Sequence, residues 1–246
     1  MSRVYSDTVL PEDSGVSQDL NLGAAGDNVI IPSGATLKTN KIADAAGNNI
    51  ITSDGSGNLT LNGAFAGSFA LISTSTPTNV GYVQITGMTA AYKCYRFTMT
   101  SMNLNTDGAE WMFALRQVGG GFSGDTKTST AWSIGHATND SYANIAYRGS
   151  TGMVRSNTAD PQHINFDQGS ATDETGFGDL YIFNPYNDTY VKQYFGTTTF
   201  YKENNELQTA HYAGFIDSTT EIDAIQFAPS SGNMTGVIKM YAFAGS

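Results

Sequence analysis

The sequence predicts an all-β protein, and three observations support this fold class. The 246 residues include 27 glycines, and Asn, Ser and Thr are frequent along the whole chain. Gly and Asn tolerate the positive φ angles of tight turns, and Thr suits the pleated surface of a strand. The chain also lacks segments rich in Ala, Leu, Glu and Lys with the period of about 3.6 residues that amphipathic helices show.

Aromatic residues divide the chain near residue 65. Of the 13 Phe, 13 Tyr and 2 Trp, only Tyr5 precedes Phe65. Large rings bury the most apolar area per side chain, so a segment without them has little from which to build a core of its own. We therefore expect a short N-terminal arm over residues 1–22, a β-rich stalk over 23–64 and a C-terminal domain over 65–246.

Short apolar pieces recur through the expected stalk between turn sequences such as Pro32-Ser33-Gly34. Pieces of about three to five residues are too short to form a stable isolated sheet. Three chains that wind together would bury one apolar side chain per piece along a common axis. The candidates for this trimer core are Ile30, Leu37, Ile42, Ile50 and Leu61. The alternative is an irregular, partly ordered arm that lies along another protein.

The residues from about 65 onward have the pattern of a complete β domain. Tyr95, Phe97 and Met99 alternate with mostly polar residues, which places the apolar side chains on one face of a strand. Roughly ten such strands, joined by Gly- and Asn-rich turns, fit an antiparallel β-sandwich of jelly-roll type. Separate strands are expected over residues 190–195 and 198–202.

Charge and cysteine content exclude several classes of function. The formal net charge is −10, from 12 Lys and Arg against 22 Asp and Glu, so the surface is unsuited to nucleic acid. No run of about 18 apolar residues is present, and residues 1–10 lack a secretory signal, so we expect no membrane insertion. Cys94 is the sole cysteine and is expected to be a structural thiol, because no intrachain disulfide can form.

Several stretches resemble proteins of bacteriophage virions. Gly34-Ala35-Thr36-Leu37 and residues 54–61 resemble the stalk segments of phage fibre proteins. The C-terminal half is similar to a module that closes many small phage structural and tail-fibre proteins, and the stretches that carry this likeness are residues 92–97, 180–185, 222–227 and 236–241. The resemblance implies a homotrimeric component on the virion surface, assembled in the host cytoplasm.

In such a virion protein the arm is expected to bind another protein of the head or tail. Residues 1–22 cannot form a core, but they can become ordered in a groove or as an added strand. Tyr5 is the expected anchor, because one buried ring supplies a large share of the energy of an interface. The candidate anchoring residues are Val4, Tyr5, Val9 and Leu10.

The sequence holds no pattern typical of a catalytic or metal site. His136, His163 and His211 lie far apart without a metal-ligand spacing. Gly121-Phe122-Ser123-Gly124 lacks the Gly-x-Ser-x-Gly spacing of serine hydrolases, and no carboxylate pair is singled out for glycoside hydrolysis. The acidic loop within residues 167–179 has no regular calcium-ligand spacing. We therefore expect a non-enzymatic protein without cofactor or metal.

Two questions of function stay open at the level of sequence. Aromatic rings near turns could stack on host-surface glycans, and the candidates are Trp132, Tyr142, Tyr186 and Tyr190. The alternative is that these rings pack the sandwich or a trimer interface. A fibre or spike that contacts the host surface is the main expectation. The alternatives are a capsid decoration protein, which stabilises the shell or gives weak adhesion, and a glycan-cleaving fibre enzyme.

Overall fold

The computed structural model describes residues 41–43, 46, 48–53, 59–61, 69–122, 126–149 and 152–243. Every regular element in these residues is a β-strand, and all paired strands are antiparallel, which confirms the all-β prediction for the described part of the chain. Among the same residues there is no helix long and apolar enough to cross a membrane. The chain divides into two compact units, residues 1–63 and 64–246. The predicted anchoring and stalk positions Val4, Tyr5, Val9, Leu10, Ile30 and Leu37 lie outside the described residues.

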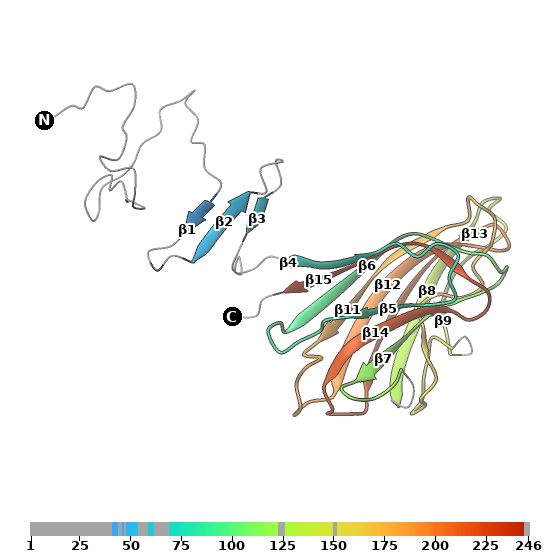
Figure 1. The fold of residues 1–246 in the computed structure, drawn as a ribbon. Helices are drawn as coiled ribbons and strands as arrows, with labels where there is room; N and C mark the ends of the chain where they lie inside the picture. Colours follow the sequence, from blue (N-terminus) through green and yellow to red (C-terminus); the bar gives the residue numbers. More distant parts are fainter. Residues whose placement is uncertain are drawn as a thin grey trace, which may run out of the picture. The chain divides into compact units, whose positions relative to one another are not determined.

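The described part of the first unit is a small three-stranded sheet. Its strands are β1 (Lys41–Ala43), β2 (Asn49–Ser53) and β3 (Leu59–Leu61), paired in the order β1-β2-β3 (Figure 1). Ile42 lies opposite Ile51, and the register shifts just beyond this pair, at the level of Ile50. Both Ile42 and Ile50 are 42% exposed. Two of the predicted stalk residues are therefore only partly covered within a single chain.

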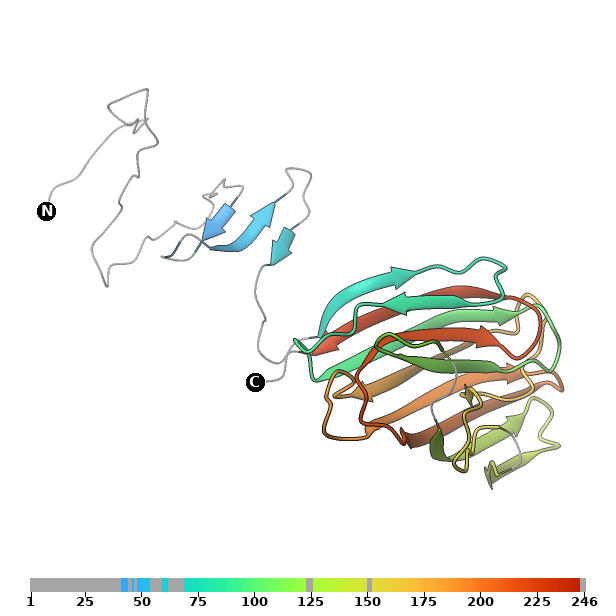
Figure 2. The same cartoon turned by 60° about the horizontal axis from the view of Figure 1, so that its bottom comes forward.

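The second unit consists of two sheets that pack face to face, as Figures 1 and 2 show. The larger sheet has eight strands in the order β4-β15-β6-β11-β12-β13-β8-β9, and the smaller has four in the order β10-β7-β14-β5. The strands are β4 (Phe69–Ser75), β5 (Val83–Thr86), β6 (Cys94–Leu104), β7 (Trp111–Gln117), β8 (Lys127–Ala137), β9 (Ala143–Tyr147), β10 (Gln162–His163), β11 (Gly176–Phe183), β12 (Lys192–Lys202), β13 (Glu206–Ile216), β14 (Ile222–Pro229) and β15 (Met234–Phe243).

The core lies between the two sheets and is rich in aromatic rings. Tyr95, Phe97 and Met99 of β6 are fully or almost fully buried, as their alternation predicts. Phe97 meets Phe227 of β14 edge to face, with ring centroids 5.7 Å apart. Phe113 of β7 meets Tyr194 of β12 in the same way at 5.2 Å. Edge-to-face pairs of this kind add to the energy of apolar burial.

The prediction of two strands over 190–195 and 198–202 is wrong, because β12 runs unbroken from Lys192 to Lys202. Gly196 does not interrupt the strand but makes room for a ring. It pairs with Tyr212 of β13, and Tyr194 of β12 pairs with Gly214 of the same neighbouring strand. Each tyrosine covers the glycine opposite it, and the hydroxyl groups of Tyr212 and Tyr194 donate to Asp179 O at 3.1 Å and to Gln162 Oε1 at 2.7 Å, respectively.

We expect the stability of the protein to fall as the pH rises above about 10. Burial raises the pKa of both Tyr194 and Tyr212 above the usual range of tyrosine. Tyrosines of the unfolded chain lose their protons near pH 10 while these two keep theirs, so each contributes a loss of about 1.4 kcal/mol per pH unit above that point. Below about pH 10 the two tyrosines contribute their full share to the stability of the fold. Urea unfolding between about pH 9 and pH 11 measures the slope.

The matched variant for this prediction is Tyr212→Phe. Burial lowers the pKa of Lys192, and a lowered lysine pKa makes the stability rise with pH, opposite to the effect of the tyrosines. Because Lys192 is present in both proteins, the difference in slope between wild type and variant reports the contribution of Tyr212 alone. We expect the variant to lose less stability with rising pH. Parallel curves for the two proteins would contradict the prediction.

Candidate binding surface

Strand β8 carries its large apolar side chains on the face turned away from the core. Burial alternates along β8 without interruption. The buried positions are small or polar: Lys127, Ser129, Ala131, Ser133, Gly135 and Ala137. Trp132 and Ile134 point outward and are 42% and 44% exposed. Strands with one solvated face normally show the opposite arrangement, with apolar side chains inside and polar ones outside.

The neighbouring strands β9 and β13 extend this inverted pattern. On β13, Leu207 is 53% exposed, whereas Glu206 and Gln208 on either side of it are buried. On the edge strand β9, Ile145 and Tyr147 are 68% and 66% exposed. We call five of the outward apolar side chains of these three strands the outer patch; they are Trp132, Ile134, Ile145, Tyr147 and Leu207.

The register of the strands makes the outer patch continuous. Tyr147 lies opposite Trp132, and Ile145 lies opposite Ile134. On its other side Trp132 is paired with His211, and the two rings are stacked with centroids 4.2 Å apart. Side chains opposite each other on one face of a sheet are in contact range, so these residues form one surface.

A polar network beneath the outer patch explains why the apolar groups face outward. The Arg148 guanidinium donates to Ser133 Oγ at 2.7 Å and to Gln208 Oε1 at 3.4 Å. Gln208 Nε2 in turn donates to Glu206 Oε2 at 2.8 Å, and the Arg148 guanidinium lies 4.0 Å from the centre of the Phe166 ring. A one-residue register slip would bury the apolar set and break these bonds. The outward position of the apolar side chains is thus part of the fold.

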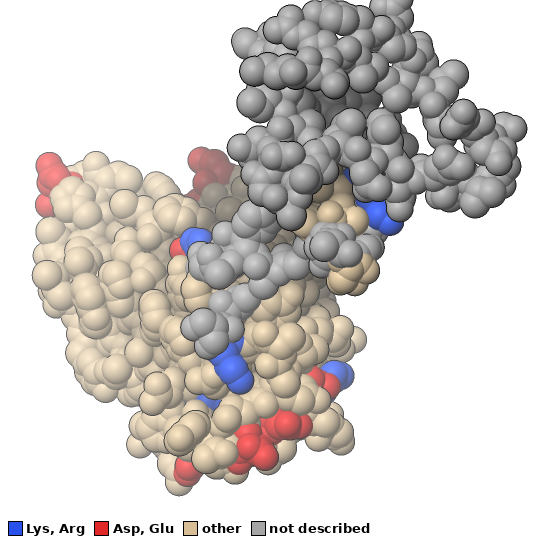
Figure 3. All heavy atoms as spheres, turned by 90° about the vertical axis from the view of Figure 1, so that its left-hand side faces the viewer, with Lys and Arg blue, Asp and Glu red and all other residues tan. Residues whose placement is uncertain are grey.

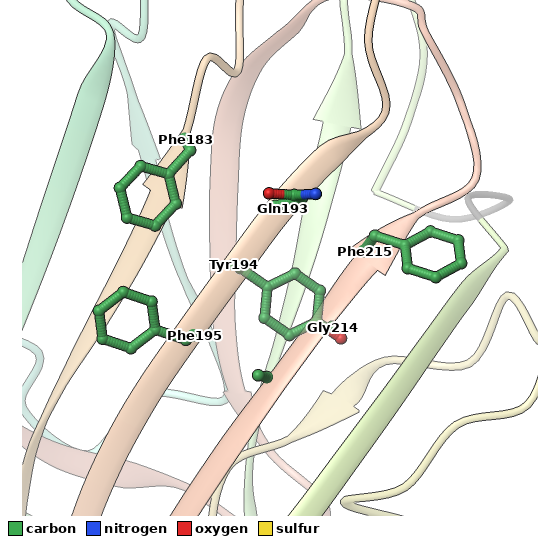
Figure 4. Close-up of a pocket in the computed structure, with 7 residues that line it drawn as sticks. Phe183, Gln193, Tyr194, Phe195, Gly214 and Phe215 are labelled. Atoms are coloured by element: carbon green, nitrogen blue, oxygen red, sulfur yellow. The ribbon is translucent and has the colours of Figure 1, made fainter.

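A second group of rings lies on the same outer face, on β11, β12 and β13. Phe195 stacks on Tyr181 with centroids 4.9 Å apart and on Phe183 at 5.7 Å. Gln193 of β12 lies between Phe183 of β11 and Phe215 of β13, as Figure 4 shows. We call Tyr181, Phe183, Phe195 and Phe215 the aromatic strip. Together with Gln193 and Ala213, its three Phe residues line an open depression of about 270 Å³.

The outer face of β12, β13, β8 and β9 carries no Asp, Glu, Lys or Arg. Its polar groups are hydroxyls, the Gln193 amide and the imidazoles of His136 and His211. On the outer face of the adjoining strands β11 and β6, the charged residues Arg96 and Asp179 pair with each other at 2.7 Å. On the side of the molecule that Figure 3 shows, the charged side chains form small separate groups.

The four candidate glycan contacts lie at three separate places. Trp132 is in the outer patch, and Tyr142 is half-buried in the turn between β8 and β9. Tyr186 and Tyr190 lie in the loop between β11 and β12, which is at the opposite end of these strands from the β8–β9 turn. An 11-residue strand spans roughly 35 Å, so one sugar ring cannot reach all four. The structure does not bring these residues together.

The titratable groups considered for chemistry each have a different local partner. His163 Nδ1 lies 2.8 Å from Glu110 Oε2, His136 Nε2 lies 3.1 Å from Asp140 Oδ1, and His211 Nδ1 is 3.0 Å from Thr197 Oγ1. Burial raises the pKa of the Cys94 thiol. In the described part of the chain no three His, Cys, Asp or Glu residues are placed to hold a metal ion.

Sequence reasoning included Trp132 but missed the rest of the outer patch and the aromatic strip. A signal for the strip was present in Leu180-Tyr181-Ile182-Phe183, which is apolar at every position. Such a run is typical of a strand covered on both faces. In the structure Leu180 and Ile182 are buried in the core, whereas Tyr181 and Phe183 lie on the outer face and are only partly covered.

Comparisons of the chain with models of protein families, with curated proteins and with solved structures find no match.

Proposed function

We propose that the chain is a non-enzymatic structural protein of a bacteriophage virion, a trimeric fibre or spike that contacts the host surface. Its arm, residues 1–22, binds a head or tail protein, its β-rich stalk joins three chains, and its jelly-roll-like sandwich is exposed. The proposal starts from the resemblance of the stalk and closing strands to phage fibre proteins.

The observation that best supports this proposal is the inverted pattern of β8. A chain that functions alone gains nothing from placing Trp132 and Ile134 in water and Ser129 and Ser133 in the interior. A repeated structural subunit does gain, because a partner covers the apolar face. The partly exposed Ile42 and Ile50 of the small first sheet fit the same account of a chain completed by copies of itself.

Imaging of the intact phage tests the proposal. Antibodies raised against residues 64–246 are expected to label an appendage of the particle and to reduce adsorption to host cells. Labelling spread over the capsid shell without any effect on adsorption would favour a decoration protein instead. Particles that carry no label, although the protein is made during infection, would contradict the proposal.

The arm supplies a second test. A chain that lacks residues 1–22 is expected to fold and to assemble but to be missing from particles, since the arm holds the candidate anchoring residues. Tyr5→Ala is expected to lower incorporation more than Asp13→Ala, because a ring contributes more to an interface than an exposed charge near a chain end. Normal incorporation of the shortened chain would show that the particle is bound elsewhere.

A further inference from the structure

The outer face of the eight-stranded sheet presents more apolar surface than a single soluble chain normally does. Seven large apolar side chains of the outer patch and the aromatic strip are between 37% and 68% exposed; they are Trp132, Ile134, Ile145, Tyr147, Phe195, Leu207 and Phe215. At about 200 Å² for each side chain, they expose roughly 700 Å² in total. The largest apolar patch of a typical monomer is about 300–600 Å², and each partner of a standard interface contributes about 800 Å².

The charges of the chain indicate which partner suits this face. The protein has a formal net charge of −10, so two copies repel each other wherever their charged surfaces meet. The outer face of β12, β13, β8 and β9 is the exception, because it carries no Asp, Glu, Lys or Arg. Two copies can therefore meet there without burying an unpaired charge, which would be costly.

The edge of the sheet next to the outer patch is also unprotected. Within the described residues β9 pairs only with β8, so its other side presents free backbone groups. Edge strands of monomeric proteins are usually protected by charged residues or proline, and Ala143–Tyr147 contains neither. An edge of this kind is compatible with a neighbouring chain beside it.

From these three features we infer that the outer patch and the aromatic strip together form the contact surface for a second copy of this chain. The inference builds on the proposed trimer and gives it an interface in the sandwich that is separate from the stalk. In the assembly, Trp132 and Ile134 are covered by the partner. The aromatic depression beside Gln193 is then part of the interface and not a site for a sugar.

Ile134→Asp in the full chain tests this interface. The variant places a carboxylate in the outer patch at a position that is already 44% exposed, so the fold of the isolated chain should tolerate it. Val118→Asp is the matched control, since Val118 is 42% exposed but lies in the turn after β7, away from the outer face. Sedimentation velocity at micromolar concentration measures the assembly of the wild type and of both variants.

We expect the wild type and Val118→Asp to assemble, and Ile134→Asp to dissociate with a dissociation constant at least about 100-fold higher. Acrylamide quenching gives an independent readout. Trp111 is 3% exposed in the single chain, so the additional quenching expected for Ile134→Asp comes from Trp132 as the partner leaves. Circular dichroism verifies that both variants are folded.

Several results would overturn the inference. A monomeric wild type would do so, and if that monomer bound neutral oligosaccharide with protection of Trp132, the occupant of the face would be a glycan. Assembly of Ile134→Asp equal to that of Val118→Asp, with Trp132 quenched equally, would place the interface elsewhere. The comparison of Ile134→Asp with Val118→Asp is separable from the test of the proposed function, because labelling of particles depends on attachment of the arm and not on which sheet face joins the copies.

Discussion

Gly196→Ala and Gly214→Ala are each expected to destabilise the protein by about 3 kcal/mol, at the upper end of the cost of overpacking a core. A Cβ atom at Gly214 would lie 2.5 Å from the Tyr194 hydroxyl oxygen and 2.6 Å from Thr128 O. A Cβ atom at Gly196 would overlap both the Tyr212 hydroxyl and the carbonyl oxygen of Asp179. Because one obstacle in each case is backbone, a change of rotamer cannot relieve the clash. Figure 4 shows the Tyr194 ring extending from β12 toward Gly214.

Thermal unfolding measures this effect, and about 3 kcal/mol corresponds to a fall in Tm of roughly 6–12 °C for a domain of this size. Gly120→Ala is the matched control. Gly120 lies in a turn with ordinary backbone angles, and its nearest neighbour would be 3.4 Å from the new Cβ atom. We expect the control to change the stability by less than about 0.5 kcal/mol. If the two strand variants were as stable as the control, the tyrosine rings would not need the space above the glycines.

Lys192→Met is expected to destabilise the protein by about 3 kcal/mol. Lys192 is fully buried, and its ammonium group donates to Asn187 O, to Tyr190 O at 2.8 Å and to Thr219 O at 3.0 Å. These carbonyl groups belong to the loop between β11 and β12 and to the loop between β13 and β14. Methionine fills a similar volume but donates no hydrogen bond, so the carbonyl groups would lose their donor.

Lys93→Met separates the loss of these bonds from the loss of a positive charge. Lys93 is exposed, so its replacement is expected to change the stability by less than about 0.5 kcal/mol. Urea unfolding of wild type and both variants gives the comparison. An equal stability of Lys192→Met and wild type would mean that the cost of burying the ammonium group offsets its three bonds.

The position of many strands follows from the sequence, because alternation and turn residues are local properties. The alternation of Tyr95, Phe97 and Met99 identifies β6 and its buried face. Gly196, in contrast, is a residue type that is typical of a break between strands, but it lies in the middle of an 11-residue strand. Tyr-x-Gly occurs on both β12 and β13, at 194–196 and 212–214, but only the antiparallel register shows that each tyrosine faces the other strand's glycine.

By itself the sequence determined the fold class, the absence of rings before Phe65 other than Tyr5, and the period of the strands. Only the tertiary structure decided which side of β8 faces the core. A period of two specifies that alternate side chains share a face, but burial depends on what packs over that face. On β8 this is set by Arg148 and Gln208, whose polar network requires Ser133 inside and so leaves Trp132 and Ile134 outside.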